Sequence, residues 1–290
     1  MSVINYKTTL TDQGLVRLAL VLLALGGLYY PVLVQLAETW AVNDNFSHGY
    51  FIPLVSIYMI FSLREQLQKE TIRPSNWGLL ILLCGLALLI LATVASLNFM
   101  QQASLLIVLW GIALYFFGRR WGALLFVPIA YLIFMIPIPA ILWNKIAFPM
   151  QLYSSAMTEM IIRMFGVTIY REGNVLYLVE TTLEVVDACS GLRSLTTMFA
   201  LSAFLAWFAH YSSWRKWVVF LAAVPIAIFV NMVRLTATAL LASRYGETVA
   251  QGFLHDFSGM LVFILGLALL WAINMLMSKG AERVESGNKV

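Results

Sequence analysis

Segment 185–195, VVDACSGLRSL, sets a thiol between two charged residues in a chain that is otherwise strongly apolar. Cys189 precedes a helical pattern, so free backbone N–H groups and the positive end of the helix dipole would favour its thiolate form. Arg193, one turn further on, would add a positive charge, and Asp187 would oppose it. The pattern predicts a nucleophilic thiolate, with a buried structural cysteine as the alternative.

A second unusual residue is Arg234 in the apolar run FVNMVRLTATALL, where Asn231 precedes it by about one turn. An arginine in a membrane-spanning helix costs at least ~2.5 kcal/mol unless it is paired or hydrated. Arg234 is therefore expected either to face a polar cavity or to extend its charge to the membrane surface.

Two histidines occur beside acidic residues at the mouths of apolar runs. His255 and Asp256 open the run GFLHDFSGML, and Asp44 and His48 lie in DNFSHGYFIP. A histidine is a ready proton acceptor near neutral pH, so either one is a candidate base. An ordinary interfacial His–Asp pair is the alternative.

A thiolate, a base and a fixed cation are the components of acyl transfer. Cysteine attacks a carbonyl carbon, histidine moves protons, and arginine stabilises an oxyanion or holds the substrate. One cysteine and two histidines without close spacing would make a poor metal site. We therefore expect neither a metal nor another cofactor.

The composition places these residues in a membrane. Of the 290 residues, 61% are hydrophobic and only 11% are charged, which is too apolar for a soluble domain of this length. The net charge of +4 is spread in small groups, which is typical of membrane flanks and gives no nucleic-acid signal. Cys84 lies inside an apolar run, so a disulfide to Cys189 is not expected.

The apolar runs predict an all-α polytopic membrane protein with about eight transmembrane helices. The predicted spans are 15–36, 48–63, 77–95, 104–118, 121–138, 191–210, 215–241 and 258–277. We expect one transmembrane domain over 1–290 that ends in a cytoplasmic tail at 278–290.

The basic residues predict the orientation of the spans. Twelve of the 18 lysines and arginines flank one side of the predicted membrane, whereas the opposite loops 37–47 and 96–103 contain none. Because cytoplasmic loops are enriched in lysine and arginine, both termini are predicted to be cytoplasmic. Segments 139–190 and 242–257 then lie outside, which brings the four polar motifs to one membrane face.

The long outer segment 139–190 has two parts. The first, 141–166, has apolar residues at helical spacing and predicts a short amphipathic helix in the membrane interface. The second, 167–188, alternates with a period of two between turn residues and predicts a small β-ribbon before the sixth span. This ribbon would deliver the chain to Cys189.

The motifs ACSGLRS, NMVR and HDFSG, in this order at successive outer helix ends, resemble the exosortase/archaeosortase family of polytopic membrane proteins. DNFSHGYFIP is similar to an early motif of that family, and the resemblance covers about 40–277. It implies a membrane cysteine transpeptidase with Cys189 as nucleophile, Arg234 as catalytic arginine and His255 as catalytic histidine. Supporting or substrate-binding positions are expected at Arg193, Asn231, Asp256, His48, Asp44 and Asp187.

The resemblance also implies a location and a substrate. The enzyme would lie in the bacterial inner membrane with its active site facing the periplasm. Its partners would be membrane-anchored exported proteins with a C-terminal sorting signal: a PEP-type motif, one transmembrane helix and a basic cytoplasmic tail. Cleavage would form a thioester on Cys189, and Arg163 or Arg171 would face an acidic residue of the motif. Such enzymes accompany exopolysaccharide and biofilm-matrix production.

Two other functions are compatible with the residues. One is a polysaccharide or lipid-intermediate transporter or assembly factor that uses no thiol chemistry. The other is an intramembrane protease that hydrolyses its substrate and transfers the acyl group only to water.

Overall fold

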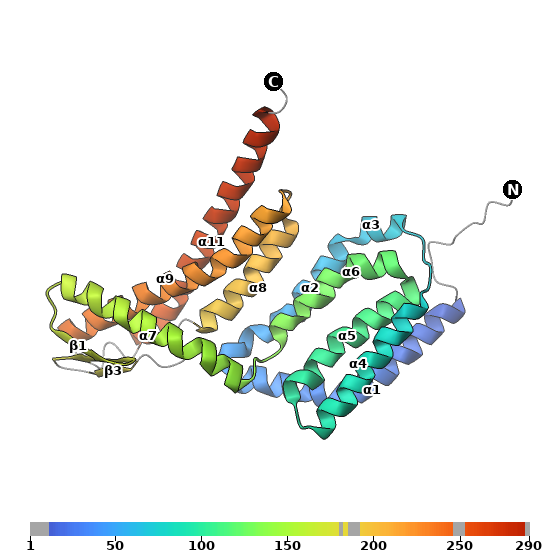
Figure 1. Cartoon of the computed structure of the whole chain (residues 1–290), viewed down its shortest axis with the longest axis horizontal. Coiled ribbons are helices and arrows are strands. Elements are labelled where there is room, and N and C mark those ends of the chain that lie inside the picture. Colours follow the sequence, from blue (N-terminus) through green and yellow to red (C-terminus); the bar gives the residue numbers. More distant parts are fainter. Residues whose placement is uncertain (1–11, 180–181, 185–191, 246–252, 288–290) are drawn as a thin grey trace. The chain divides into compact units, whose positions relative to one another are not determined.

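The computed structural model describes residues 12–179, 182–184, 192–245 and 253–287. Contacts divide the chain into two compact units, one ending at Pro139 and the other beginning at Ala140, and each is described on its own. Helices dominate both units (Figure 1). The chain is an all-α polytopic membrane protein, as the apolar runs predict.

The first unit is built around a tight helix hairpin. Its elements are α1 (Asp12–Val42), η1 (Asp44–Tyr50), α2 (Phe51–Ser62), α3 (Arg64–Lys69), α4 (Asn76–Val94), α5 (Asn98–Phe117), α6 (Arg119–Tyr131) and η2 (Leu132–Met135). Helices α4 and α5 form the hairpin (Figure 1). A Cβ added to Gly111 of α5 would lie 2.6 Å from the backbone nitrogen of Leu82 in α4. Small residues allow this close approach, as is usual between membrane helices.

Helix α1 packs against this hairpin. Its Tyr29 and Val32 are buried together with Leu89 of α4 and Val108 of α5. The Tyr29 hydroxyl lies 2.8 Å from the Ser104 Oγ of α5, so each buried oxygen has a hydrogen-bond partner. This hydrogen bond fixes α1 against α5 at one height.

The second unit combines a bundle of long helices with a small sheet. Its elements are α7 (Ala140–Met164), β1 (Ile169–Glu172), β2 (Val175–Leu178), β3 (Thr182–Glu184), α8 (Leu192–Phe208), α9 (Ser213–Tyr245) and α11 (Phe253–Gly287). The strands form an antiparallel sheet in the order β1-β2-β3, so the predicted β-ribbon is confirmed.

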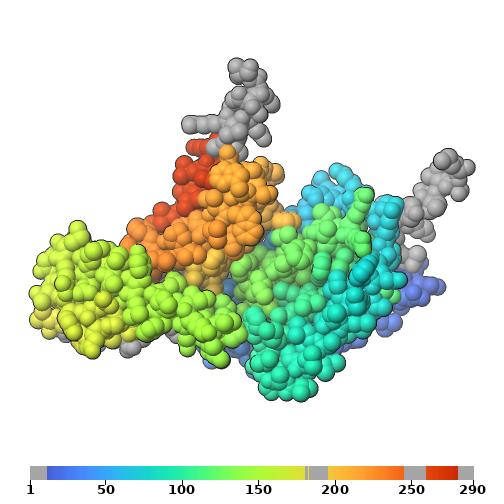
Figure 2. All heavy atoms as spheres, in the orientation of Figure 1, coloured from blue at the N-terminus to red at the C-terminus, as the bar shows by residue number. Residues whose placement is uncertain are grey.

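The ribbon is held to the helices by an apolar core. Ile169 and Leu178 are opposite each other in β1 and β2 and are buried with Ile162 of α7 and Leu235 of α9. Gly173 has a φ of 62° in the turn between these strands, a conformation that glycine adopts without strain. In Figure 2 the ribbon and the end of α7 form one continuous mass of yellow-green atoms.

Helices α8, α9 and α11 form a three-helix bundle. Met198 of α8, Val230 of α9 and Leu270 of α11 are buried in its core. A Cβ added to Gly266 of α11 would lie 2.7 Å from Met198 Cε and 3.7 Å from Val230 Cγ2. Met198, Val230 and Gly266 are called the Gly266 layer below. Helix α9 runs opposite to α8 and α11 (Figure 1).

Within the described residues, five helices are long and apolar enough to cross a membrane. They are Asp12–Val42, Asn76–Val94, Asn98–Phe117, Ser213–Arg244 and Gly259–Lys279. The interrupted pair Arg119–Met135 and Ala140–Met164 would make a sixth as a broken span or re-entrant loop.

The predicted count of eight spans is not confirmed. The run 48–63 begins with the 3₁₀ turns of η1, so α2 has only 12 residues. The run 191–210 contains α8, with 17 residues. A helix needs about 20 residues to cross the membrane, so α2 and α8 are both shorter than a typical membrane-spanning helix.

Candidate active site

The Cys189 motif precedes the start of α8, and the His255 motif lies at the start of α11. Cys189 and Asp187 lie outside the described residues. Arg193 lies in the first turn of α8, and His255 and Asp256 lie in the first turn of α11. Helix α8 begins at Leu192, three residues after Cys189, and the N–H groups of its first turn have no intrahelical acceptor.

Because α9 runs opposite to α8 and α11, the start of α8, the later part of α9 and the start of α11 are on the same side of the Gly266 layer. In Figure 1 the start of α8, the start of α11 and the later part of α9 point toward the lower end of this bundle, and the last turns of α9 extend to the ribbon. With a rise of ~1.5 Å per residue, Arg234 lies about 6 Å from the Gly266 layer along its helix, Arg193 about 8 Å and His255 about 16 Å. Arg234 and Arg193 are therefore at similar heights, and His255 is about two turns closer to the helix ends.

Arg234 lies on a polar turn of α9. Its own side chain is half-buried, and Asn231, one turn earlier, is 2% exposed. The Nδ2 of Asn231 has no hydrogen-bond partner among the described residues. Since a buried amide loses its hydration without compensation, such a group is typical of a site that receives a polar ligand or water.

Helix α7 contributes further buried polar groups, which the sequence analysis did not single out. They are called the α7 polar stripe: Gln151, Ser154, Ser155 and Thr158. The stripe shares a helix face with Ile162, which packs in one core with Leu235 of α9. Its signal in the sequence is the spacing of three and four residues between small polar side chains, in register with Ile162.

The three hydroxyl groups of the α7 polar stripe differ in their hydrogen bonding. Ser155 Oγ donates to the Gly173 carbonyl at 3.1 Å and so ties α7 to the ribbon turn. Ser154 Oγ and Thr158 Oγ1 are fully buried, yet they have no hydrogen-bond partner in the described part of the chain. The stripe thus presents unused hydrogen-bonding groups toward the interior of the second unit.

Two basic residues expected on the outer side form ion pairs within the chain. Glu159 of α7 lies 2.6 Å from Arg163 and 2.9 Å from Arg171 of β1. Arg171 also donates to the Gly173 carbonyl at 2.8 Å. These contacts join α7 to the ribbon, which accounts for both arginines without an acidic residue from a substrate.

In the first unit, Asp44 and His48 both lie in η1. His48 Nε2 is 3.2 Å from the Phe134 carbonyl oxygen, which can only accept, so this nitrogen carries the hydrogen and donates the hydrogen bond. Burial lowers the pKa of His48, and backbone hydrogen bonds to Phe134 and Asn45 oppose that shift. His48 thus joins η1 to η2, while Asp44 is exposed.

Potential metal ligands are dispersed in the described part of the chain. No group of three or more histidine, cysteine, aspartate or glutamate side chains is placed there to hold a metal ion. Cys84 of α4 is an exposed free thiol on an apolar helix.

These features define a multi-pass helical membrane protein with a small ribbon beside a three-helix bundle. A family model described as transmembrane exosortase matches residues 40–272. The chain therefore belongs to the transmembrane exosortase family, as the motif resemblance implied. No curated protein and no solved structure matches it significantly.

Proposed function

We propose that this exosortase is a cysteine transpeptidase of the bacterial inner membrane that cleaves C-terminal sorting signals of exported proteins. The observation that carries the proposal is the family match over 40–272, which includes the Cys189, Arg234 and His255 motifs in order. The common end of α8, α9 and α11 and the polar turn at Arg234 also support it.

In the first half-reaction, the Cys189 thiolate attacks the carbonyl carbon of the scissile peptide bond in the PEP-type motif. Arg234 stabilises the oxyanion of the tetrahedral intermediate. His255 accepts the thiol proton and delivers it to the leaving amine as the C–N bond breaks. The products are a thioester on Cys189 and a free amine on the released transmembrane helix with its basic tail.

In the second half-reaction, an acceptor attacks the thioester carbonyl and restores the thiol. An amine acceptor forms a new amide, which is transpeptidation, and water forms a carboxylic acid, which is hydrolysis. The proton of the acceptor goes to His255 and then to the departing thiolate, so the enzyme is regenerated unchanged.

The proposed orientation suits this substrate. With both termini in the cytoplasm, as the basic residues predict, a substrate helix with a basic cytoplasmic tail inserts in the same sense as the enzyme. Its sorting motif then lies at the periplasmic face, where the starts of α8 and α11 are predicted to be.

The test uses co-expression with a tagged protein that carries a PEP-type motif, a transmembrane helix and a basic tail. Cys189→Ala is expected to abolish processing, and Cys84→Ala, which removes the other thiol, should leave it intact. A polar thiol reagent added outside should label the wild type and Cys84→Ala but not Cys189→Ala. Normal processing by Cys189→Ala would instead favour a transporter or assembly factor that uses no thiol.

A further inference from the structure

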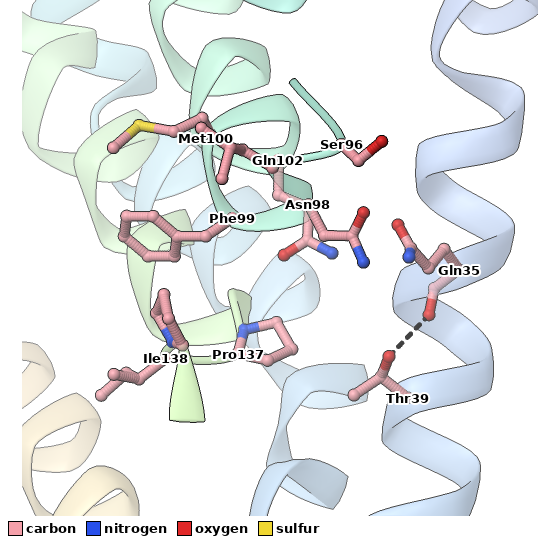
Figure 3. Close-up of a pocket in the computed structure, with 11 residues that line it drawn as sticks. Gln35, Thr39, Ser96, Asn98, Phe99, Met100, Gln102, Pro137 and Ile138 are labelled. Atoms are coloured by element: carbon pink, nitrogen blue, oxygen red, sulfur yellow. Dashed lines mark hydrogen bonds between the residues drawn. The ribbon is translucent and has the colours of Figure 1, made fainter. Parts of the chain in front are cut away.

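The first unit contains a largely apolar pocket with several carboxamides in its wall, and the proposed chemistry does not use it. It has a volume of about 340 Å³ and lies between the end of α1, the α4–α5 turn and the segment 137–139 (Figure 3). Gln35 and Thr39 line it from α1, and Asn98 and Gln102 line it from α5. Pockets of this size hold a small ligand or a short stretch of chain.

Gln102 is the clearest indication that the pocket receives a ligand. It is 3% exposed, and its Oε1 has no hydrogen-bond partner among the described residues. Buried polar atoms nearly always have a partner, because a lone one loses its hydration without compensation. In Figure 3 the amides of Gln102 and Asn98 gather on one side of the pocket, and that of Gln35 faces them. Three carboxamides are thus directed into one space.

The lining indicates the chemistry of this ligand. All the described lining residues are uncharged, so none can neutralise a phosphate or a carboxylate. A carboxamide carries the same N–H donor and C=O acceptor as a peptide unit, so it can pair with a main chain by two hydrogen bonds. Leu97, Phe99 and Ile138 add apolar surface that suits uncharged side chains.

One wall of the pocket is held rigidly. Pro137 and Pro139 fix their own backbone φ angles. The Trp40 indole donates to the Met135 carbonyl at 2.9 Å and so secures the chain just before Pro137 to the end of α1. A rigid wall lowers the entropy lost when an extended ligand is bound.

We infer that this pocket is an exosite that binds an uncharged, extended segment of the substrate polypeptide through main-chain hydrogen bonds, apart from the scissile bond. The inference rests on the proposed function. It also rests on the predicted topology, in which loops 37–47 and 96–103 lie outside, on the side of the exported part of the substrate.

The main test follows processing of the tagged substrate by pocket variants. Gln102→Met and Asn98→Ala remove one carboxamide each, and Gln102→Met keeps the length of the side chain. Each is expected to raise KM roughly three- to tenfold with kcat unchanged, because the lost hydrogen bond is made equally in the ground state and the transition state. Gln101→Met is the matched control, because Gln101 Nε2 donates to the Ala92 carbonyl at 3.3 Å and does not line the pocket.

A direct binding measurement separates this inference from the proposed function. In the Cys189→Ala background, Gln102→Met should weaken capture of the tagged substrate by the same factor as it raises KM. If Cys189→Ala alone abolishes processing but the pocket variants keep wild-type KM, the exosite is wrong and the transpeptidase stands. If Cys189→Ala still processes substrate, the proposed function fails first. A third outcome is a pocket variant that keeps the wild-type KM and yet is no longer stabilised against unfolding by added phosphatidylethanolamine. That result would assign the pocket to a lipid headgroup and overturn the exosite.

Discussion

Arg171 of β1 lies 2.9 Å from Glu159 of α7, and this ion pair joins the ribbon to the helix beneath it. Both side chains are less than one-third exposed, so the pair is only partly screened by solvent. We expect Glu159→Gln to destabilise the second unit by about 1–2 kcal/mol, between the values for exposed and buried pairs. Thermal unfolding in detergent measures this. Glu172→Gln, at an exposed position of β1, is the control, and equal unfolding midpoints for both variants would refute the expectation.

A branched side chain at Gly266 requires the buried Met198 methyl group to move. In Gly266→Val the new methyl groups would meet Met198 and Val230, so we expect a loss of roughly 1–3 kcal/mol from overpacking. Gly27→Val of α1 is the matched change, since a Cβ there meets nothing within 4 Å. Unfolding in detergent compares the two, and a destabilised Gly27→Val with an unaffected Gly266→Val would contradict the packing described.

The α7 polar stripe gives a contrast between neighbouring hydroxyls. Thr158→Val removes a buried hydroxyl that has no partner among the described residues, so stability should stay equal or rise. Ser155→Ala removes the hydrogen bond to the Gly173 carbonyl and should lower stability by about 1 kcal/mol. The unfolding midpoints of the two variants test this contrast. A less stable Thr158→Val with an unaffected Ser155→Ala would show that Thr158 is the bonded hydroxyl.

Arg234→Lys tests the role of the planar guanidinium. An arginine that only extends its charge to the membrane surface can be replaced by lysine, whereas one that holds an oxyanion with two donors cannot. We expect normal accumulation in the membrane and a loss of roughly 10²–10³ in the processing rate. The measurement is a time course of substrate cleavage. Processing close to the wild-type rate would reduce the proposed catalytic set to Cys189 and His255.

The predicted topology can be tested with reporter fusions. Fusions after Gln66 and Arg120 should report the cytoplasm, and fusions near Asn98 and Asn174 should report the outside, since basic residues flank only the first two positions. An external signal at Gln66 would overturn the orientation and, with it, the periplasmic placement of the proposed site.

Features with a local signal were predictable from the sequence. The ribbon followed from period-two alternation around Gly173, whose positive φ defines the turn. The long spans followed from continuous apolar runs such as the one in α4. The start of α8 followed from the polar residues around Cys189, which lie ahead of its apolar run.

Features that depend on distant residues were not predictable. The run 48–63 is mostly apolar, yet it begins with 3₁₀ turns in which His48 bonds the Phe134 carbonyl, 86 residues away. The exosite carboxamides come from α1 and α5, and only packing brings Gln35 toward Gln102. Hydropathy places each residue at a membrane depth but does not say which partner lies beside it.

The α7 polar stripe bears on how the chain is assembled. Helix α7 carries Ser154 and Thr158 on its buried face and apolar side chains such as Ile141 and Phe148 on its exposed face. It is therefore polar toward the protein interior and apolar toward its surroundings. Left alone in lipid, it would turn hydroxyl and amide groups toward hydrocarbon. It reaches a stable position only when α9 can cover the stripe, and α9 is made about fifty residues later. We therefore expect α7 to take its final position only after α9 has been synthesised, so the order of the helices in the chain delays docking of the first helix of the second unit.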